Sequence, residues 1–300
     1  MRSLALAEAL AELGIESIFA GEFDAAIRTR IESAGMRCDT AERSDVCGVV
    51  IDSYQQRPQH DVAPVLLIDD FAALDRYDCA AVLNFTMRSA DLAYPRGPRL
   101  FLGPRWFPAR RALRLMRGRG QRREIGDVRH VLVAVALDDM AVPVLEALQS
   151  FDRDVSVHVV VGKSRAEMED KLRRFRADSR VLTGLPDLAA ELAWADVCIA
   201  TAGLTKYEAA YLGVPSLLIP QNEGQDRDAD FFDAAGVAIN LGVTATDLEK
   251  ELHLLMSDRA LRESMRRKAL GLFPDDPTRD LASALVANVF VRSAEASGAC

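Results

Sequence analysis

Several features that mark other classes of protein are missing from this chain of 300 residues. No apolar run approaches the roughly 18 residues of a membrane-spanning helix, and the N-terminus lacks the charged-then-apolar pattern of a signal peptide. The five cysteines form no C-x-x-C pair and the four histidines are isolated, which predicts reduced thiols and no zinc site. A net charge of −8 argues against general nucleic-acid binding. We therefore expect a cytoplasmic protein with no metal, no cofactor and no nucleic-acid partner.

The chain length and the order of its apolar segments predict two α/β domains. Short apolar runs, such as residues 65–68 and 197–199, are typical of buried parallel strands and alternate with segments of helical content. The first domain is predicted over residues 1–112 and the second over residues 127–300. Between them, residues 113–126 are predicted to form a linker.

The predicted linker belongs to an unusually basic stretch. Residues 110–123 contain seven arginines and no acidic residue. A basic run of this kind is usually a solvated face, and Gly118 and Gly120 predict flexibility.

Residues 196–225 carry the strongest functional pattern in the chain. They predict a buried strand, a turn of small residues, a helix ended by Gly213, a second strand, and a loop that contains Gln225. A small-residue turn between a parallel strand and a helix leaves backbone N–H groups pointing out of the sheet's carboxyl edge, where a phosphate or diphosphate can bind. From spacing alone, a purely structural turn explains the pattern equally well. The predicted phosphate-binding residues are Thr201, Ala202, Gly203, Leu204 and Thr205. Glu208, one turn into the helix, could reach a ribose diol beside that phosphate.

This stretch resembles the donor-binding segment of GT-B enzymes that handle UDP-sugars. It is similar to the lipid-II N-acetylglucosaminyltransferases and, more closely, to the UDP-2,4-diacetamido-2,4,6-trideoxy-β-L-altropyranose hydrolases of pseudaminic acid biosynthesis. The matching positions are Ala195, Asp196, Gly203, Thr205, Glu208, Leu212, Gly213, Pro215, Pro220 and Gln225. The resemblance implies a GT-B-like α/β fold of two Rossmann-like domains whose parallel sheets face a cleft, with a last helix that returns to the first domain. It also implies that Leu185 and Leu188 pack on the uracil of a UDP-sugar ligand, although two core leucines would give the same pattern.

Polar residues follow the predicted strands of the first domain, at the edge where a doubly wound sheet places ligands. Asp52 follows one strand and Asn84 ends another, although Asp and Asn also initiate turns and cap helices, a role that explains Asp52 equally well. The resemblance implies that the bond between sugar and diphosphate reacts among Asp52, Tyr54, Asn222 and Gln225. In the family pattern an asparagine directly precedes the glutamine, and Asn222 is the substitute for it in this chain. The resemblance further implies substrate contacts from Arg2, Asn84 and Arg105.

The chain departs from the hydrolase pattern at three places. Arg2 matches the arginine of a G-x-G-H-x-x-R segment, but the rest of that segment and the strand before it would lie upstream of residue 1, so we expect a truncated family member. A Gly-Gly turn is replaced by residues 136–139, Ala-Leu-Asp-Asp, whose Cβ atoms and carboxylates disfavour a bound phosphate. No histidine is predicted at a strand end facing the cleft, and no Ser-His-Asp triad is visible.

Three functions follow from these patterns. The first is a nucleotide-sugar hydrolase that releases UDP from an amino-deoxy sugar in pseudaminic acid biosynthesis. The second is a GT-B glycosyltransferase that uses a UDP- or CMP-sugar, since water and an acceptor hydroxyl occupy the same place. The third is a noncatalytic nucleotide-sugar-binding protein, which the lost glycines and the missing histidine favour.

Overall fold

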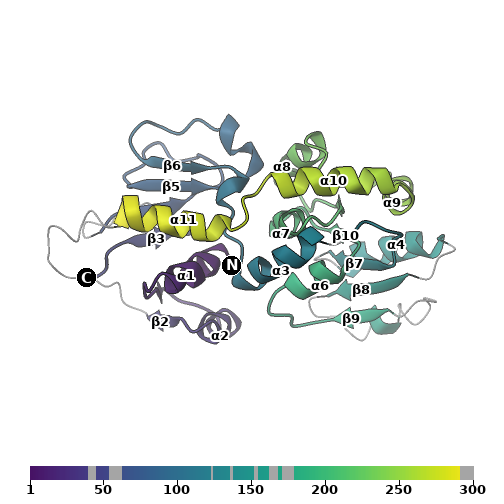
Figure 1. Ribbon diagram of the computed structural model, residues 1–300, viewed down its shortest axis with the longest axis horizontal. Coiled ribbons are helices and arrows are strands. Elements are labelled where there is room, and N and C mark those ends of the chain that lie inside the picture. The colour runs from purple at the N-terminus through teal and green to yellow at the C-terminus, as the bar shows by residue number, and fades with distance from the viewer. Residues whose placement is uncertain are drawn as a thin grey trace. The chain divides into compact units, whose positions relative to one another are not determined.

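The computed structural model describes residues 1–39, 45–53, 63–122, 124–135, 138–151, 155–161, 168–170 and 179–290. The chain divides into two compact units (Figure 1). Unit 1 contains Met1–Arg111 and the segment from Phe273 onward, and unit 2 contains Ala112–Leu272. The last helix therefore belongs to unit 1, as the resemblance implied, and the predicted second domain over residues 127–300 is corrected to end before it.

Unit 1 is built from parallel strands and the helices that connect them. Its helices are α1 (Arg2–Glu12), α2 (Ala25–Ser33) and α11 (Pro277–Leu285), with short 3-10 turns η1 (Met87–Asp91) and η2 (Pro104–Trp106) and a π-helical turn η3 (Val286–Phe290). Its strands are β1 (Ile18–Ala20), β2 (Arg37–Asp39), β3 (Val49–Ile51), β4 (Val65–Ile68), β5 (Ala81–Asn84) and β6 (Arg99–Leu102). Among the described residues, β1 pairs with β2, and a separate sheet has the order β3-β4-β5-β6, with every pair parallel.

The chain's last described segment is fixed to unit 1 by polar and apolar contacts. Asp276 caps α11 by accepting a hydrogen bond from the Arg279 amide at 3.0 Å. Thr278 is buried and donates to the Ala109 carbonyl at 2.9 Å. Figure 1 shows α11 lying alongside α1, whose leucine and alanine face is buried against it.

Unit 2 is a parallel sheet with helices between its strands. Its helices are α3 (Arg111–Arg122), α4 (Asp138–Gln149), α6 (Ala189–Trp194), α7 (Leu204–Leu212), α8 (Glu223–Ala234), α9 (Leu248–Ser257) and α10 (Arg259–Gly271). Its strands are β7 (His130–Ala134), β8 (Ser156–Val160), β9 (Arg180–Leu182), β10 (Val197–Ala200), β11 (Ser216–Leu218) and β12 (Ile239–Asn240). The described strands have the order β12-β11-β10-β7-β8-β9 and pair in parallel throughout. The prediction of two α/β units with parallel sheets is confirmed.

The strand order of unit 2 reverses between β7 and β10. The chain runs from β7 through β8 to β9 at one edge, and β10 then pairs with the other side of β7, with Ala200 opposite Ala134. Where the order of an open parallel sheet reverses, the neighbouring connections leave to opposite faces and open a crevice at the carboxyl ends of the strands. The turn after β10 lies at this position.

Residues 113–122 of the predicted flexible linker lie in the helix α3. Gly118 and Gly120 lie inside α3, because tertiary contacts outweigh their low helix propensity. Leu113 is buried, and the buried Arg117 guanidinium lies 4.3 Å above the Tyr211 ring and donates to the Leu270 carbonyl at 3.2 Å.

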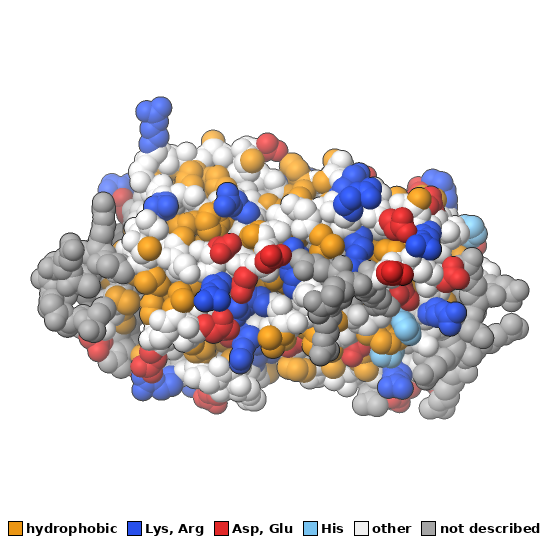
Figure 2. All heavy atoms as spheres, in the orientation of Figure 1, with side chains coloured by type: hydrophobic (Ala, Val, Ile, Leu, Met, Phe, Trp, Pro, Cys, Tyr) orange, Lys and Arg blue, Asp and Glu red, His pale blue; other side chains and the backbone are white. Residues whose placement is uncertain are grey.

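On the face shown in Figure 2, the described basic and acidic side chains are interspersed. Within the described ranges, no helix is both long enough and apolar enough to cross a bilayer.

Candidate functional site

The turn between β10 and α7 presents an open backbone at the switch point of unit 2. Thr201 donates its amide to the Ala134 carbonyl of β7 at 3.4 Å, and Gly203 is the N-cap of α7 with no side-chain cap. Gly203 has a φ of −82°, outside the left-handed region that favours glycine. Among the described atoms, a Cβ atom at Gly203 would meet only the Thr201 Oγ1 atom, at 3.9 Å. Packing against the described residues therefore does not require glycine here, and these residues leave room for a ligand beside the turn.

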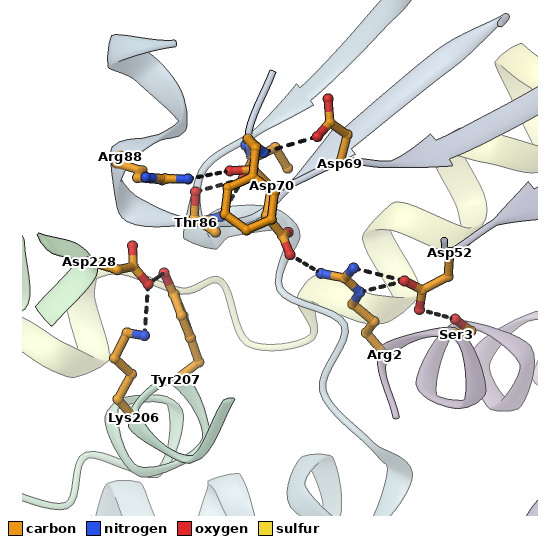
Figure 3. Close-up of polar contacts among 12 residues, drawn as sticks. Arg2, Ser3, Asp52, Asp69, Asp70, Thr86, Arg88, Lys206, Tyr207 and Asp228 are labelled. Atoms are coloured by element: carbon orange, nitrogen blue, oxygen red, sulfur yellow. Dashed lines mark hydrogen bonds and ion pairs between the residues drawn. The ribbon is translucent and has the colours of Figure 1, made fainter. Parts of the chain in front are cut away.

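A buried ion pair lies next to this turn (Figure 3). The Lys206 ammonium donates to the Asp228 Oδ2 atom at 2.7 Å and to the Ala202 carbonyl at 2.5 Å, with the Gly203 carbonyl 3.4 Å away. Tyr207 donates its hydroxyl to the same Asp228 oxygen at 3.2 Å. The Lys206 side chain is 3% exposed. Sequence reasoning missed this pair, because its two residues lie on different helices.

Glu208 lies inside a helix that is buried on every side. Residues 206–212 of α7 are all buried, and Glu208 is 8% exposed. Complete burial, with a smaller effect of the Glu208 carboxylate, raises the pKa of Cys198 to about 12. The predicted helix end is confirmed, because Gly213 takes the left-handed conformation at the C-cap. Contact between Glu208 and a ribose stays a prediction.

Asn222 and Gln225 have a structural role at the start of α8. The Asn222 Oδ1 atom accepts a hydrogen bond from the Gln225 amide at 3.0 Å, and the Gln225 Oε1 atom accepts one from the Gln221 amide at 3.0 Å. The loop expected through Gln225 is therefore the first turn of a helix, with an arrangement close to a capping box. The N-x-x-Q spacing of Asn222 and Gln225 was the sequence signal for this helix cap. A catalytic role for either residue stays a prediction, and their amide oxygens are already used.

In unit 1, Arg2 joins the ends of two strands (Figure 3). Its guanidinium pairs with Asp52 after β3, at 2.8 Å, and with Asp70 after β4, at 2.5 Å. Ser3 donates to the other Asp52 oxygen at 2.5 Å. Burial opposes ionisation of Asp52, but the Arg2 and Ser3 hydrogen bonds outweigh it and lower the pKa of the carboxyl. The sequence placed Arg2 and Asp52 in one site, and the structure brings them together, whereas Tyr54 lies outside the described residues.

Asn84 is buried within a hydrogen-bonded network of unit 1. Its Oδ1 atom accepts from the Thr86 amide at 2.9 Å, and its Nδ2 atom donates to the Tyr94 hydroxyl at 2.8 Å. Tyr94 in turn donates to the Asp69 carbonyl at 2.8 Å, and burial raises the pKa of Tyr94 to about 12. These bonds give Asn84 a part in holding the strand ends, so its predicted contact with substrate stays a prediction.

Arg105, Leu185 and Leu188 are the remaining predicted site residues, and their roles stay predictions. Arg105 lies on η2 with its guanidinium 4.9 Å from the Trp106 ring centre. Leu185 and Leu188 precede α6 and are both partly exposed, so neither is a fully buried core leucine, and contact with uracil stays a prediction. Residues 136–137 and the side chains of residues 138–139 lie outside the described part, so the altered turn is untested. The described His, Cys, Asp and Glu side chains include no group of three or more that could hold a metal ion.

Residues 132–279 match the family model of the glycosyltransferase family 28 C-terminal domain. The chain is 28% identical over 152 residues to the spore coat polysaccharide biosynthesis protein SpsG of Bacillus subtilis, a match that covers 47% of this chain and 45% of that protein. It is 31% identical over 161 residues to the UDP-N-acetylglucosamine–N-acetylmuramyl-(pentapeptide) pyrophosphoryl-undecaprenol N-acetylglucosamine transferase of Xanthomonas campestris, with 51% of this chain and 38% of that protein covered. The chain thus spans less than half the length of these relatives.

Solved structures share the fold over nearly the whole chain. The crystal structure of Acinetobacter baumannii MurG superposes with a TM-score of 0.66 and 16% identity, covering 94% of both chains. The UDP-GlcNAc 2-epimerase of Neisseria meningitidis bound to UDP-GlcNAc gives a TM-score of 0.62 and 11% identity, covering 96% of this chain and 98% of that chain. The predicted GT-B-like α/β fold is confirmed. The family 28 match covers residues 132–279, most of which belong to unit 2.

Proposed function

We propose that the chain is a glycosyltransferase that takes a UDP-sugar donor into unit 2. The observation that carries the proposal is the open turn at Gly203, which lies at the switch point and inside the part that matches the family model. A backbone turn that no packing contact fills, at the start of a helix, suits the close approach of a diphosphate. The name of the Xanthomonas relative, a UDP-N-acetylglucosamine-dependent transferase, supports the same substrate class.

In this proposal, different described residues of unit 2 bind different parts of the donor. The N–H groups of residues 203–205 hold the diphosphate, and their partial positive charge stabilises the UDP that leaves during transfer. Glu208 accepts hydrogen bonds from the ribose diol, and Leu185 and Leu188 pack on the uracil. The Asn222 and Gln225 amide nitrogens are the groups of these two side chains that can donate to the sugar, since both amide oxygens serve the cap of α8.

The pseudaminic acid pathway hydrolase is the second candidate, because the structure brings together Arg2 and Asp52, which the hydrolase pattern singles out. In the hydrolase reaction, water would attack from the position that the acceptor hydroxyl takes in a transferase. The lowered pKa of Asp52 makes this carboxylate a weak proton acceptor at neutral pH, so it is better suited to holding Arg2 than to activating water.

Calorimetric titration with UDP, CMP and ADP tests the proposal, followed by assays of UDP release from UDP-N-acetylglucosamine. We expect binding that is selective for UDP and UDP release that depends on an added sugar or lipid-linked acceptor. Release of free sugar without an acceptor would favour the hydrolase. Selective binding without turnover on any donor or acceptor would favour the noncatalytic alternative, and no nucleotide binding would contradict a donor site in unit 2.

A further inference from the structure

We propose that Lys206 is a positioning residue that turns the backbone N–H groups of the β10–α7 turn toward the donor diphosphate. The inference rests on the proposed function, because it concerns the same donor site. In this proposal the lysine lies on the side of the turn that carries the carbonyl oxygens, beside the ligand site, and does not contact the ligand.

The contacts of the Lys206 ammonium fix the direction of two peptide groups. It lies 2.5 Å from the Ala202 carbonyl oxygen and 3.4 Å from the Gly203 carbonyl oxygen. Both peptides are trans, so each N–H group points away from its own carbonyl. When the two carbonyls face the ammonium, the N–H groups of Gly203 and Leu204 face the opposite side. The arrangement a bound anion needs is therefore formed before the ligand arrives.

The other contacts of Lys206 explain why it does not contact the diphosphate directly. Asp228 accepts its third hydrogen bond at 2.7 Å, and the ammonium lies 4.9 Å from the Tyr207 ring centre and 5.6 Å from that of Phe232. A lysine ammonium has three donors, and these three oxygens use them. Its side chain is 3% exposed. Because Asp228 neutralises the charge, the pair acts through geometry, with little net attraction for an anion.

The Lys206–Asp228 pair also ties the turn to α8. Asp228 lies on α8, and its Oδ2 atom receives both the ammonium and the Tyr207 hydroxyl. The turn and the start of α8 are thereby held in one arrangement. Removing one charge alone would leave the other buried without its partner, which destabilises proteins strongly. A test must therefore remove both charges together.

The experiment compares K206M/D228N, in which both charges are removed together, with the unaltered chain. K206M/D228N should lose UDP affinity by about tenfold or more, since the Ala202 carbonyl then loses the lysine donor that turns it away from the ligand. Calorimetry measures the affinity for UDP, and saturation-transfer NMR measures the binding of uridine, which has no diphosphate. Uridine binding should not change. The matched control is R259M/E263Q, which removes an exposed ion pair of α10.

The results of the experiment separate a positioning role of Lys206 from a general structural role. Loss of UDP affinity with uridine binding retained supports the positioning role. Equal loss for both ligands, or no loss for either, overturns it, because a general structural role would affect both. If the double variant does not fold, K206Q/D228N is read in the same way. Absence of UDP binding to the unaltered chain would instead contradict the proposed function, and the inference would fall with it.

Discussion

The ring of Phe290 packs on Gly48 so closely that a Cβ atom at position 48 would overlap the ring carbons Cδ1, Cε1 and Cγ. Phe290 is 4% exposed and ends the π-helical turn η3, while Gly48 lies just before β3. Glycine is required here by the ring, because its φ does not fall in the left-handed region. This contact attaches the end of the described chain to the four-stranded sheet of unit 1.

Gly48→Ala should destabilise the protein by about 1–3 kcal/mol, because the added methyl group overpacks a filled site. Thermal unfolding followed by circular dichroism measures the effect. Gly126→Ala is the matched control, since a Cβ atom at Gly126 meets no atom within 4 Å. An unchanged melting temperature for Gly48→Ala would show that η3 does not pack on β3 as described.

Arg117→Met should lower the free energy of unfolding by about 1.5–3 kcal/mol. The buried guanidinium donates to the carbonyls of Tyr211 and Leu270, and methionine leaves both without this partner. Arg259→Met, at an exposed arginine of α10, should change stability by no more than about 0.5 kcal/mol. Equal effects of the two substitutions in urea denaturation would contradict a bridging role for Arg117.

The strands and α7 could be predicted from the sequence because their signals are local. The predicted runs at 65–68 and 197–199 correspond to β4 and β10, whose residues are all buried. The small turn and Gly213 bound α7 as expected, because a left-handed C-cap favours glycine whatever the rest of the fold does.

The errors arose where distant contacts decide the structure. A basic segment with two glycines is typical of a linker, but Arg117 is held by carbonyls 94 and 153 residues away. Lys206 and Asp228 are 22 residues apart in the sequence and lie on separate helices, so no local pattern marks this pair. The Asn222 cap was a local signal, and it was missed because the resemblance assigned that residue a catalytic role.

The pair of Arg2 and Asp52 should make stability depend on acid pH. The pKa of Asp52 is lowered in the folded state, so its contribution is complete above the ordinary carboxyl pKa of 3.8 and is lost as the pH falls through the folded-state value. At neutral pH, Asp52→Asn should cost about 1–2 kcal/mol, because the pair is only partly exposed. Urea denaturation between pH 2 and pH 7 should show the two proteins converging below the ordinary carboxyl pKa. Asp78→Asn, in an exposed pair, is the control. A difference that persists at the lowest pH would contradict the prediction.

Glu208→Ala should weaken UDP binding by about 1–3 kcal/mol if the carboxylate holds the ribose diol. The same substitution should have a smaller effect on 2′-deoxy-UDP, which lacks one of the two hydroxyls. Calorimetric titration of both ligands gives the difference, and Glu263→Ala on α10 serves as an exposed control. Unchanged UDP affinity would remove Glu208 from the donor site and leave it as a buried residue of α7.

Gly203→Ala separates a ligand-binding turn from a structural one, because the two roles predict opposite results. The φ of Gly203 lies outside the left-handed region, and among the described atoms its Cβ atom would meet only Thr201 Oγ1, at 3.9 Å. Stability should therefore change by no more than about 0.5 kcal/mol. The methyl group would occupy the space into which a diphosphate must come, so UDP affinity should fall by about tenfold or more, with uridine binding unchanged. Gly271→Ala, at another glycine with no atom within 4 Å of its Cβ position, should alter neither quantity. Unchanged UDP affinity in Gly203→Ala would mean that the diphosphate binds elsewhere.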